Sequence, residues 1–552
     1  MGKFMQIIVK NLRVPVTEPI GSVIDAAKKK LRLSGGEFIS ASIHKRSVDA
    51  RRRAGHDIEL VCSVTVECEL SEKKLKCLNL PDFEIVKREK LDFPKAKHDS
   101  LKRPLIVGFG PCGMFAALLL AENGYSPIVV ERGGDIAERQ YAVEQFNRTG
   151  RLDLSSNIQF GAGGAGTFSD GKLVTRINDP RCHYVLERLN EFGAPDEILT
   201  LAKPHIGTDR LVKVVGNLKE RIEALGGEVR FKTKLCGIKI SGGRVASVRL
   251  SDNGGEYELE PDGVILAVGH SARDTYDLLD RSGIGLLPKP FSVGVRVEHL
   301  QSDIDRMLYG EKAAEYRSRG LLPPGEYSLS YRERQPGLLS DSARGVYSFC
   351  MCPGGEVVAA ASEEGGVVTN GMSRYARDGR NANSAIAVSV FPEDTGGGWR
   401  DGIRFQRELE KKAFIAGGGG YSAPVELLGD FLEGRRSGFS KPGKVTPTYR
   451  EGAGAFNVCD LSEVLPGFVT DLLRTGFRNF GRKMSGFDAA DSLLTGVETR
   501  TSAPVRIPRG EDGKASGIAN LFPCGEGAGY AGGITSAAVD GIRAAFAYAK
   551  NV

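Results

Sequence analysis

The stretch PLIVGFGPCGMFAALLLAENG, residues 104–124, decides the fold. A short apolar run leads into Gly108, Gly110 and Gly113, which form a GxGxxG, and helix-forming residues follow. In this fingerprint the first glycine turns the chain off a parallel strand, the second lets a pyrophosphate touch backbone, and the third packs helix against strand. The next apolar run ends at Glu131, 23 residues after Gly108. A carboxylate there accepts both ribose hydroxyls of a dinucleotide and repels a 2′-phosphate, which disfavours NADP.

We therefore predict a Rossmann-type dinucleotide domain that begins at residue 104. The alternative, a glycine-rich turn without a ligand, is weakened by the combination of strand, helix and acid. The expected cofactor contacts of this segment are Gly108, Gly110, Pro111, Cys112, Gly113, Glu131 and Arg132.

A second GxGxxG, at Gly161, Gly163 and Gly166, lies within NIQFGAGGAGTFSDGK, residues 157–172. The residues after Gly166 favour a turn over a helix, and no strand ending in an acid follows about 20 residues on. We predict a wide glycine loop rather than a second Rossmann site, with backbone N–H groups free to face a phosphate or a flavin ring. The expected contacts are Gly163, Gly164 and Thr167.

The composition is that of a globular protein. The chain has 552 residues, 41% of them hydrophobic, which is enough for three or four domains. Its apolar run at residues 114–121 is far shorter than the roughly 18 residues of a membrane span, and no leader pattern opens the sequence. We therefore expect a cytoplasmic protein without a membrane partner. Ten scattered cysteines form no CxxC pair, so we expect neither a disulfide scaffold nor a metal site.

The basic excess lies at the N-terminal end, where residues 1–103 hold 22 Lys and Arg against 14 Asp and Glu. The pattern predicts a small α/β unit over residues 1–90, which is compatible with a ferredoxin-like fold, and a linker at 91–103. Its expected elements are strands at 4–10, 38–51 and 57–70, a helix at 23–33 and a turn at RRRAGH. Three partners are considered for the basic turn: RNA, an acidic protein and another subunit. The alternative is that this turn contacts solvent alone. The lack of an RNP-like aromatic pattern argues against nucleic acid, although that partner stays open.

Two later segments complete the Rossmann pattern. GVILAVGHSARD, residues 263–274, is a buried strand that ends at Gly269, and IANLFPCGEGAGYAGG, residues 518–533, gives a strand, a GEG turn and a second glycine cluster. Together with VGFGPCG and ERGG, they resemble the glutathione-reductase class of two-domain FAD flavoproteins. More narrowly, the chain resembles the bacterial family of FAD-dependent, or NAD(FAD)-utilising, dehydrogenases over nearly its whole length. The motifs that carry this resemblance are GAGGAGTFSDGKL, FCMCPGGEV, ETRTSAPVRI and GEGAGYAGGITSAAVDG.

The resemblance implies FAD as the cofactor and places Gly525 and Glu526 near its ribityl and pyrophosphate groups. Glu526 stands where many relatives have Asp, so that the longer side chain could reach through a water. From the residues alone, an apolar helix follows residue 533 with Thr535 or Ser536 as its cap, and its N-terminus favours negative charge on the reduced flavin. The expected contacts of this part are Gly269, Gly525, Glu526, Gly532, Gly533 and Ile534.

The expected fold class is α/β, with a Rossmann-type FAD-binding domain, an inserted β-rich substrate domain and the small N-terminal unit. The FAD-binding domain takes residues 104–290 and 450–552, and the insert takes 291–449. Within the insert, FSVGVRVEH alternates valine with small or charged residues, and GVYSFCMCPGGEVVAAAS reads as a hairpin that turns at residues 353–355.

Three residues are candidates for the substrate side. Lys172 follows the second glycine loop, His270 follows the buried strand, and Arg500 precedes the terminal motif. Each has a structural alternative, respectively a solvated turn, backbone pairing and a salt bridge. Cys350 and Cys352 lie two apart in a strand, on one face, where pocket lining or core packing is favoured over a redox pair.

These patterns predict an FAD-dependent oxidoreductase that exchanges hydride between flavin N5 and a small molecule. With one convincing fingerprint, NAD(P)H would dock transiently as an electron donor or be absent. Two alternatives stay open: a flavoprotein that modifies or binds RNA, and a non-catalytic flavin-binding sensor or assembly protein. The substrate, the catalytic acid or base and the oligomeric state are left open by the sequence.

Overall fold

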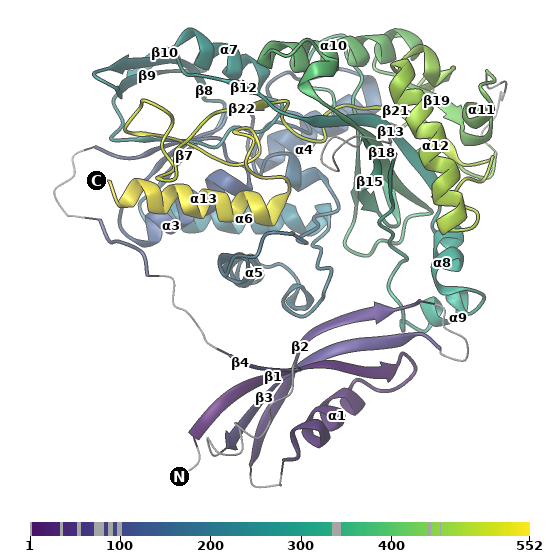
Figure 1. The fold of residues 1–552 in the computed structure, drawn as a ribbon. Helices are drawn as coiled ribbons and strands as arrows, with labels where there is room; N and C mark the ends of the chain where they lie inside the picture. Colours follow the sequence, from purple (N-terminus) through teal and green to yellow (C-terminus); the bar gives the residue numbers. More distant parts are fainter. Residues whose placement is uncertain are drawn as a thin grey trace.

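The computed structural model describes residues 3–33, 37–51, 57–70, 82–86, 92–96, 102–333, 344–436, 438, 443–452 and 454–551. The molecule has three parts, which are an N-terminal sheet, a parallel sheet and a large mixed sheet (Figure 1). Residues 52–56, which make up most of the predicted basic turn, and residues 91 and 97–101 of the predicted linker lie outside the described residues. No helix of the described part is long and apolar enough to span a bilayer.

The N-terminal unit is an antiparallel sheet of order β2-β3-β1-β4 with one helix against it (Figure 1). Its elements are β1 (Lys3–Pro15), α1 (Gly21–Leu31), β2 (Phe38–Asp49), β3 (Glu59–Leu70) and β4 (Phe83–Ile85). Val23, Ala27 and Leu31 lie four residues apart on α1 and are all fully buried, which is why this short helix stays on the sheet. The strand order is that of a ferredoxin-like unit.

The predicted Rossmann-type sheet is confirmed as five parallel strands in the order β23-β11-β5-β6-β7. These strands are β5 (Leu105–Val107), β6 (Ile128–Val130), β7 (Glu228–Arg230), β11 (Val264–Leu266) and β23 (Leu521–Pro523). The helices of this part are α3 (Pro111–Glu122), α4 (Ile136–Thr149), α5 (Arg181–Glu191), α6 (Thr208–Ala224), α7 (Arg273–Arg281) and α13 (Ile534–Ala549). A Cβ added to Gly113 would lie 1.9 Å from the carbonyl oxygen of Gly108, so the third fingerprint glycine lets α3 pack directly on the turn.

The chain has three smaller groups of elements. A three-stranded antiparallel sheet is made of β8 (Lys234–Ser241), β9 (Arg244–Asp252) and β10 (Gly255–Leu259). Two short pairs join β12 (Leu287–Pro288) to β22 (Val505–Arg506), and β16 (Gly355–Ala359) to β17 (Thr369–Ser373). The remaining helices are α8 (Gln301–Tyr309), α9 (Ala313–Ser318), α10 (Trp399–Ala416), α11 (Leu428–Glu433) and α12 (Gly467–Lys483).

The central domain is built on a seven-stranded sheet of order β14-β15-β18-β13-β21-β19-β20. Its strands are β13 (Phe291–Leu300), β14 (Ser330–Arg332), β15 (Gly345–Cys352), β18 (Asn381–Val390), β19 (Ala423–Leu427), β20 (Phe456–Val458) and β21 (Leu493–Glu498). The expected end of this domain at residue 449 differs from the structure, because β20 and β21 pair into the same sheet. The C-terminal contribution to the parallel part is therefore β22, β23 and α13 alone.

The hairpin expected at residues 353–355 is wrong. β15 pairs with β14 and β18, whereas β16 pairs with β17, so residues 353–354 connect two different sheets. The turn residues were identified correctly, but the strands on either side of a turn need not pair with each other.

A buried ion cluster joins the parallel part to the central domain. Glu410 on α10 accepts hydrogen bonds from Arg273 on α7, at 2.7 Å, and from Arg500 just after β21, at 2.9 Å. All three side chains are at most 4% exposed. Burial alone would raise the pKa of Glu410, but the two guanidinium charges outweigh it and hold that pKa well below its usual range.

We expect Glu410→Gln to destabilise the protein strongly, because it leaves two buried arginines short of a counter-charge. Removing one partner of such a cluster costs about 3–5 kcal/mol of unfolding free energy. Glu408→Gln, an exposed position on the same helix, is the matched control. Since the pKa of Glu410 is depressed, the difference between wild type and Glu410→Gln should persist from neutral pH down to about pH 4.5 and shrink only in stronger acid. Thermal denaturation across that pH range measures this difference. Equal melting temperatures of Glu410→Gln and Glu408→Gln would contradict the stabilising role of Glu410.

Candidate functional site

Three glycine segments that are distant in sequence meet at one place. A Cβ added to Gly164 would lie 2.9 Å from the Cα of Gly110, and one added to Gly166 would lie 3.1 Å from Cγ1 of Ile534. The fingerprint turn, the second glycine loop and the start of α13 are therefore neighbours. We call residues 108–113, 161–166 and 532–534 the glycine junction.

Glu131 holds the junction together. One carboxylate oxygen accepts the N–H of Phe109, and the other accepts the N–H groups of Gly133 and Gly161, each at 3.0 Å. A carboxylate has about four lone-pair positions, so three backbone donors leave about one for a ribose hydroxyl. The structure adds a loop-holding role to this residue, and its contact with a nucleotide stays a prediction.

Arg139, on α4, was missed by the sequence analysis. Its fully buried guanidinium donates to the carbonyl oxygens of Asn157, Ile158 and Ala162 at 2.9, 2.9 and 2.6 Å. Burial lowers the pKa of Arg139 to about 9, which still leaves it charged at neutral pH. The spacing in the sequence could have indicated that Arg139 is buried, because it shares the inward face of α4 with Val143, four residues later.

Two helices begin at the junction without a side-chain cap. The N-cap of α3 is Gly110 and that of α13 is Gly533, and neither helix receives a capping hydrogen bond from a side chain of the described residues. The predicted caps of α13 are wrong, since the Thr535 hydroxyl donates to the carbonyl oxygen of Leu173 at 2.8 Å and Ser536 accepts the N–H of Gly532 at 3.2 Å. Both N-termini thus keep backbone donors for an anion.

Some glycines of the site are not required by packing. A Cβ added to Gly269 or Gly532 would meet nothing within 4 Å, and neither residue has a positive φ. Since neither sterics nor backbone conformation demands glycine at these two positions, they fit close approach by a ligand.

The terminal motif carries a carboxylate without a protein partner. The N–H of Gly525 is held by Asp540 at 2.7 Å, whereas the half-buried side chain of Glu526 has no hydrogen bond within the described part of the chain. Burial raises the pKa of Glu526 to about 7, opposed by the charge of Lys289. A hydroxyl of a bound ligand would satisfy this carboxylate.

The other predicted cofactor residues have protein partners. Arg132 pairs with Asp274 at 2.9 Å and lies 4.5 Å above the ring of Phe160. The Thr167 hydroxyl faces the carbonyl oxygen of Ala162 at 3.4 Å, and the sulfur of Cys112 lies 3.3 Å from that of Cys524. Their contacts with a cofactor remain predictions.

The three substrate-side candidates lie in different surroundings. Lys172 forms an ion pair with Glu326 at 3.1 Å, and Arg500 is occupied by Glu410 in the buried cluster. His270 meets the hydroxyl of Ser271 at 2.9 Å. Burial, with the nearby charges of Arg500 and Arg273, lowers the pKa of His270 to about 3, so the ring is neutral at pH 7. A catalytic role for each stays a prediction.

A buried polar layer covers one face of the central sheet. Arg296 is fully buried and donates to Glu498 at 2.9 and 3.1 Å and to Asn383 at 3.0 Å. The alternation of FSVGVRVEH corresponds to β13, which is buried on both faces, and Asn370 of the β16–β17 pair reaches Arg296 at 2.9 Å. This layer gives the central domain a polar interior.

Cys350 and Cys352 lie at the edge of this layer. The register of β15 against β18 shifts between residues 349 and 352, and Cys350 has a φ of 43°, so simple alternation does not place the two thiols. Burial raises the pKa of Cys350 to about 12 and that of Cys352 to about 11. Both thiols are therefore protonated at neutral pH, which disfavours nucleophilic or redox chemistry there.

Comparison with known proteins identifies relatives of the chain. Residues 290–501 match the family described as "FAD-dependent protein, C-terminal domain-like". An uncharacterized protein of Clostridium beijerinckii is 45% identical over 543 residues, which is 98% of each chain.

Solved structures give weaker matches. A triple mutant of a flavin-dependent brominase is 12% identical, over 81% of this chain and 80% of that one, with a TM-score of 0.34. A geranylgeranyl bacteriochlorophyll reductase-like protein of Thermoplasma acidophilum is 13% identical, over 80% and 77%, with a TM-score of 0.33. Similarities this low support no inference about the reaction of this chain.

We expect Arg139→Met to release the second glycine loop, because three buried carbonyl groups lose their donor. The loss of unfolding free energy should be about 3 kcal/mol or more, and loop residues 157–162 should become accessible to amide hydrogen exchange. Arg148→Met, at an exposed position in the last turn of the same helix, is the matched control. Unchanged exchange in the Arg139 variant would show that the loop is held by something else.

The raised pKa of Glu526 predicts how the stability of the protein changes with pH. A protein loses stability as pH rises from the unfolded pKa of such a carboxyl group to its folded pKa, here from about 4.5 to about 7. The ligand-free protein should lose about 1–3 kcal/mol over that interval through this group, and Glu526→Gln should flatten the slope. Melting curves at pH 5, 6, 7 and 8 measure both; a slope equal in the two proteins would contradict the burial of this carboxyl.

Proposed function

Because the chain belongs to one family with the Clostridium beijerinckii protein and its residues 290–501 match a family of FAD-dependent proteins, we propose that it is an FAD-dependent oxidoreductase acting on a small molecule. The observation that carries this proposal is the glycine junction, where two uncapped helix N-termini meet. An elongated, doubly charged cofactor suits this arrangement better than a small neutral ligand does.

The residues present fit FAD on several independent points. The N-termini of α3 and α13 offer backbone donors to the pyrophosphate and to a negatively charged part of the flavin. Gly269 and Gly532 leave space that packing does not require, and Glu526 has a free carboxylate for a ribityl hydroxyl. Glu131 keeps about one acceptor position for a ribose hydroxyl.

FAD, when bound, would supply hydride and electron transfer at its isoalloxazine ring. The chain's own residues would bind and orient it, while Lys172 and Glu326 provide a fixed pair of charges beyond the second glycine loop. With a pKa of about 3, His270 is neutral at pH 7, so its ring offers one N–H donor and one acceptor nitrogen and is a weak general base.

We expect Gly110→Ala and Gly269→Ala each to lower FAD affinity at least tenfold without unfolding the protein. A Cβ at Gly110 would come no closer than 3.7 Å to protein, and one at Gly269 would meet nothing within 4 Å, so any loss comes from the ligand. Gly285→Ala, which also meets nothing within 4 Å and has no positive φ, is the matched control. FAD binding is measured from the visible spectrum after reconstitution and filtration. A colourless wild-type protein that takes up no FAD would sink the proposal.

The electron donor is the second part of the proposal. We expect anaerobic addition of NADH, NADPH or a metabolite from a panel to bleach the bound flavin, with NAD(P)H docking transiently. A flavin that no donor reduces, in a protein that purifies with a partner, would favour the non-catalytic alternative instead. Salt-dependent binding of tRNA would favour the RNA alternative, because phosphate contacts weaken as salt rises.

A further inference from the structure

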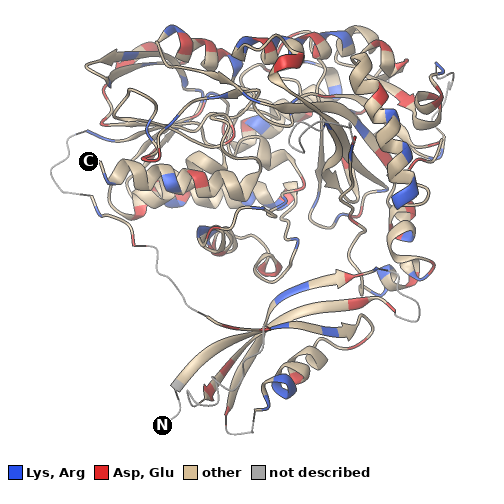
Figure 2. Cartoon of the chain, in the orientation of Figure 1, with Lys and Arg blue, Asp and Glu red and all other residues tan. Residues whose placement is uncertain are grey.

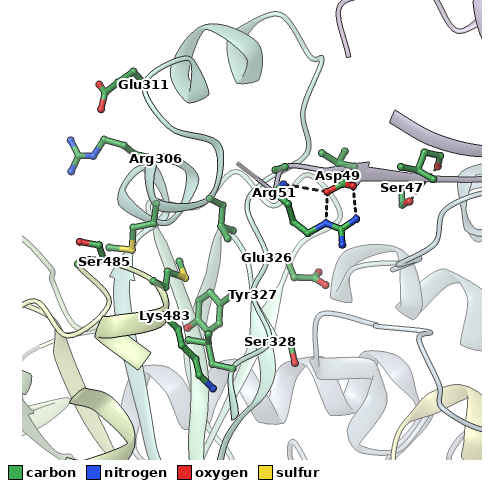
Figure 3. Close-up of a pocket in the computed structure, with 18 of the residues that line it drawn as sticks. Ser47, Asp49, Arg51, Arg306, Glu311, Glu326, Tyr327, Ser328, Lys483 and Ser485 are labelled. Carbon is green, nitrogen blue, oxygen red and sulfur yellow. Dashed lines mark hydrogen bonds and ion pairs between the residues drawn. The ribbon is translucent and has the colours of Figure 1, made fainter. Parts of the chain in front are cut away.

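A large cavity lies between the N-terminal unit and the central domain (Figure 3). Its volume is about 1090 Å³, enough for a metabolite-sized ligand. The walls come from the end of β2, from α8, from residues 326–329 and from the end of α12 with the residues that follow it.

The N-terminal unit is docked firmly enough to act as a wall. The edge strand β2 exchanges backbone hydrogen bonds with the body, since Arg46 donates to Thr200 at 2.7 Å and accepts from Ala202 at 2.9 Å. Asp57 accepts hydrogen bonds from Tyr316 at 3.0 Å and from Lys312 at 3.2 Å. An apolar cluster closes the contact beside them, made of Val16, Ile58, Tyr316 and Leu322.

The cavity is connected to the glycine junction by a short chain of contacts. Thr535, at the start of α13, donates to the carbonyl oxygen of Leu173, and the adjacent Lys172 pairs with Glu326 at 3.1 Å. Glu326 and Tyr327 both line the cavity. The Tyr327 hydroxyl also meets the hydroxyl of Ser384, on β18, at 2.7 Å. A ligand in the cavity would therefore lie one side-chain layer from Lys172.

The walls carry more positive than negative charge. The cationic side chains are Arg13, Arg51, Arg306, Arg482 and Lys483, and the anionic ones are Asp49, Glu311 and Glu326. Asp49 pairs with Arg51 (Figure 3) and with Arg13. Glu326 pairs with Lys172, Lys203 and Arg377, which do not line the cavity. Arg306, near the end of α8, and Arg482, in the last turn of α12, are exposed. Figure 2 shows the charged residues of both helices. An anion entering here meets a net attractive field.

We propose that this cavity admits a small organic anion to the flavin, and that the N-terminal unit serves as its outer wall. The inference rests on the proposed function, because it needs a flavin at the glycine junction. A carboxylate or phosphate group suits the arginines equally, and both sources share this chemistry. The lining mixes basic residues with Asp49, Glu311 and Glu326, which favours a small anion over a nucleic acid, whose backbone would need a continuous basic face.

The test compares two reductants of opposite charge on the FAD-loaded protein. The double variant Arg306→Glu, Arg482→Glu reverses two exposed charges of the wall, while Arg404→Glu, Arg281→Glu is the matched control. The match is close: Arg306 and Arg404 are 62% and 64% exposed and each pairs with an aspartate three residues earlier, and Arg482 and Arg281 both lie in the last turn of a helix. Anaerobic loss of flavin absorbance, or of viologen colour, gives the rate.

At low ionic strength, dithionite, an anion, should reduce the flavin of the wall variant at least threefold more slowly than that of wild type. Reduced methyl viologen, a cation, should reduce the flavin of the wall variant at least threefold faster than that of wild type. Roughly 0.5 M salt should remove both differences. The control variant should behave as wild type with both reductants. Rates that do not separate by charge in a protein that holds FAD would overturn this inference alone, whereas a protein that holds no FAD overturns the proposed function as well.

Discussion

The carboxylate of Glu131 and the guanidinium of Arg139 together fix the second glycine loop, on which the candidate site depends. The first collects N–H groups from Phe109, Gly133 and Gly161, and the second collects carbonyl groups from residues 157–162. A buried loop without regular structure must find partners for its backbone, because each unpaired group costs free energy. Here two ionised side chains supply those partners. The glycines at the two helix N-termini therefore keep their backbone donors uncapped on the side where a ligand would lie.

Local patterns in the sequence were enough for the parallel sheet and the glycine segments. The run 104–124 and the strand that ends near Gly269 each declare strand, turn and helix within a few residues. The convergence of Gly110, Gly164 and Ile534 followed from the family resemblance together with the rule that ligands lie beyond the carboxyl ends of parallel strands. Roles that depend on one side chain meeting a distant backbone, as for Arg139, needed the structure.

The errors in the central domain have the same cause. The segment around residue 353 has good turn chemistry, yet β15 pairs with β14, the preceding strand, and with β18, which β16 and β17 separate from it in the chain. The alternation of β13 likewise gave no sign that a second layer of chain covers its charged residues and makes buried pairs such as Arg296 with Glu498. Strand pairing and the cover over a sheet are set by the whole chain, and a short window cannot reveal either one.

The chain order of the parallel sheet constrains how the protein is made. The strand at one end of that sheet, β23, and the helix that packs against α3 come from residues 521–549, more than 400 residues after β5. A ribosome therefore exposes α3 and its fingerprint turn for most of the time of synthesis before the segment that covers them emerges. Throughout that interval the apolar surface of α3 must be shielded by the nascent chain itself or by chaperones, and the proposed cofactor can be taken up with its full set of contacts only after α13 has emerged.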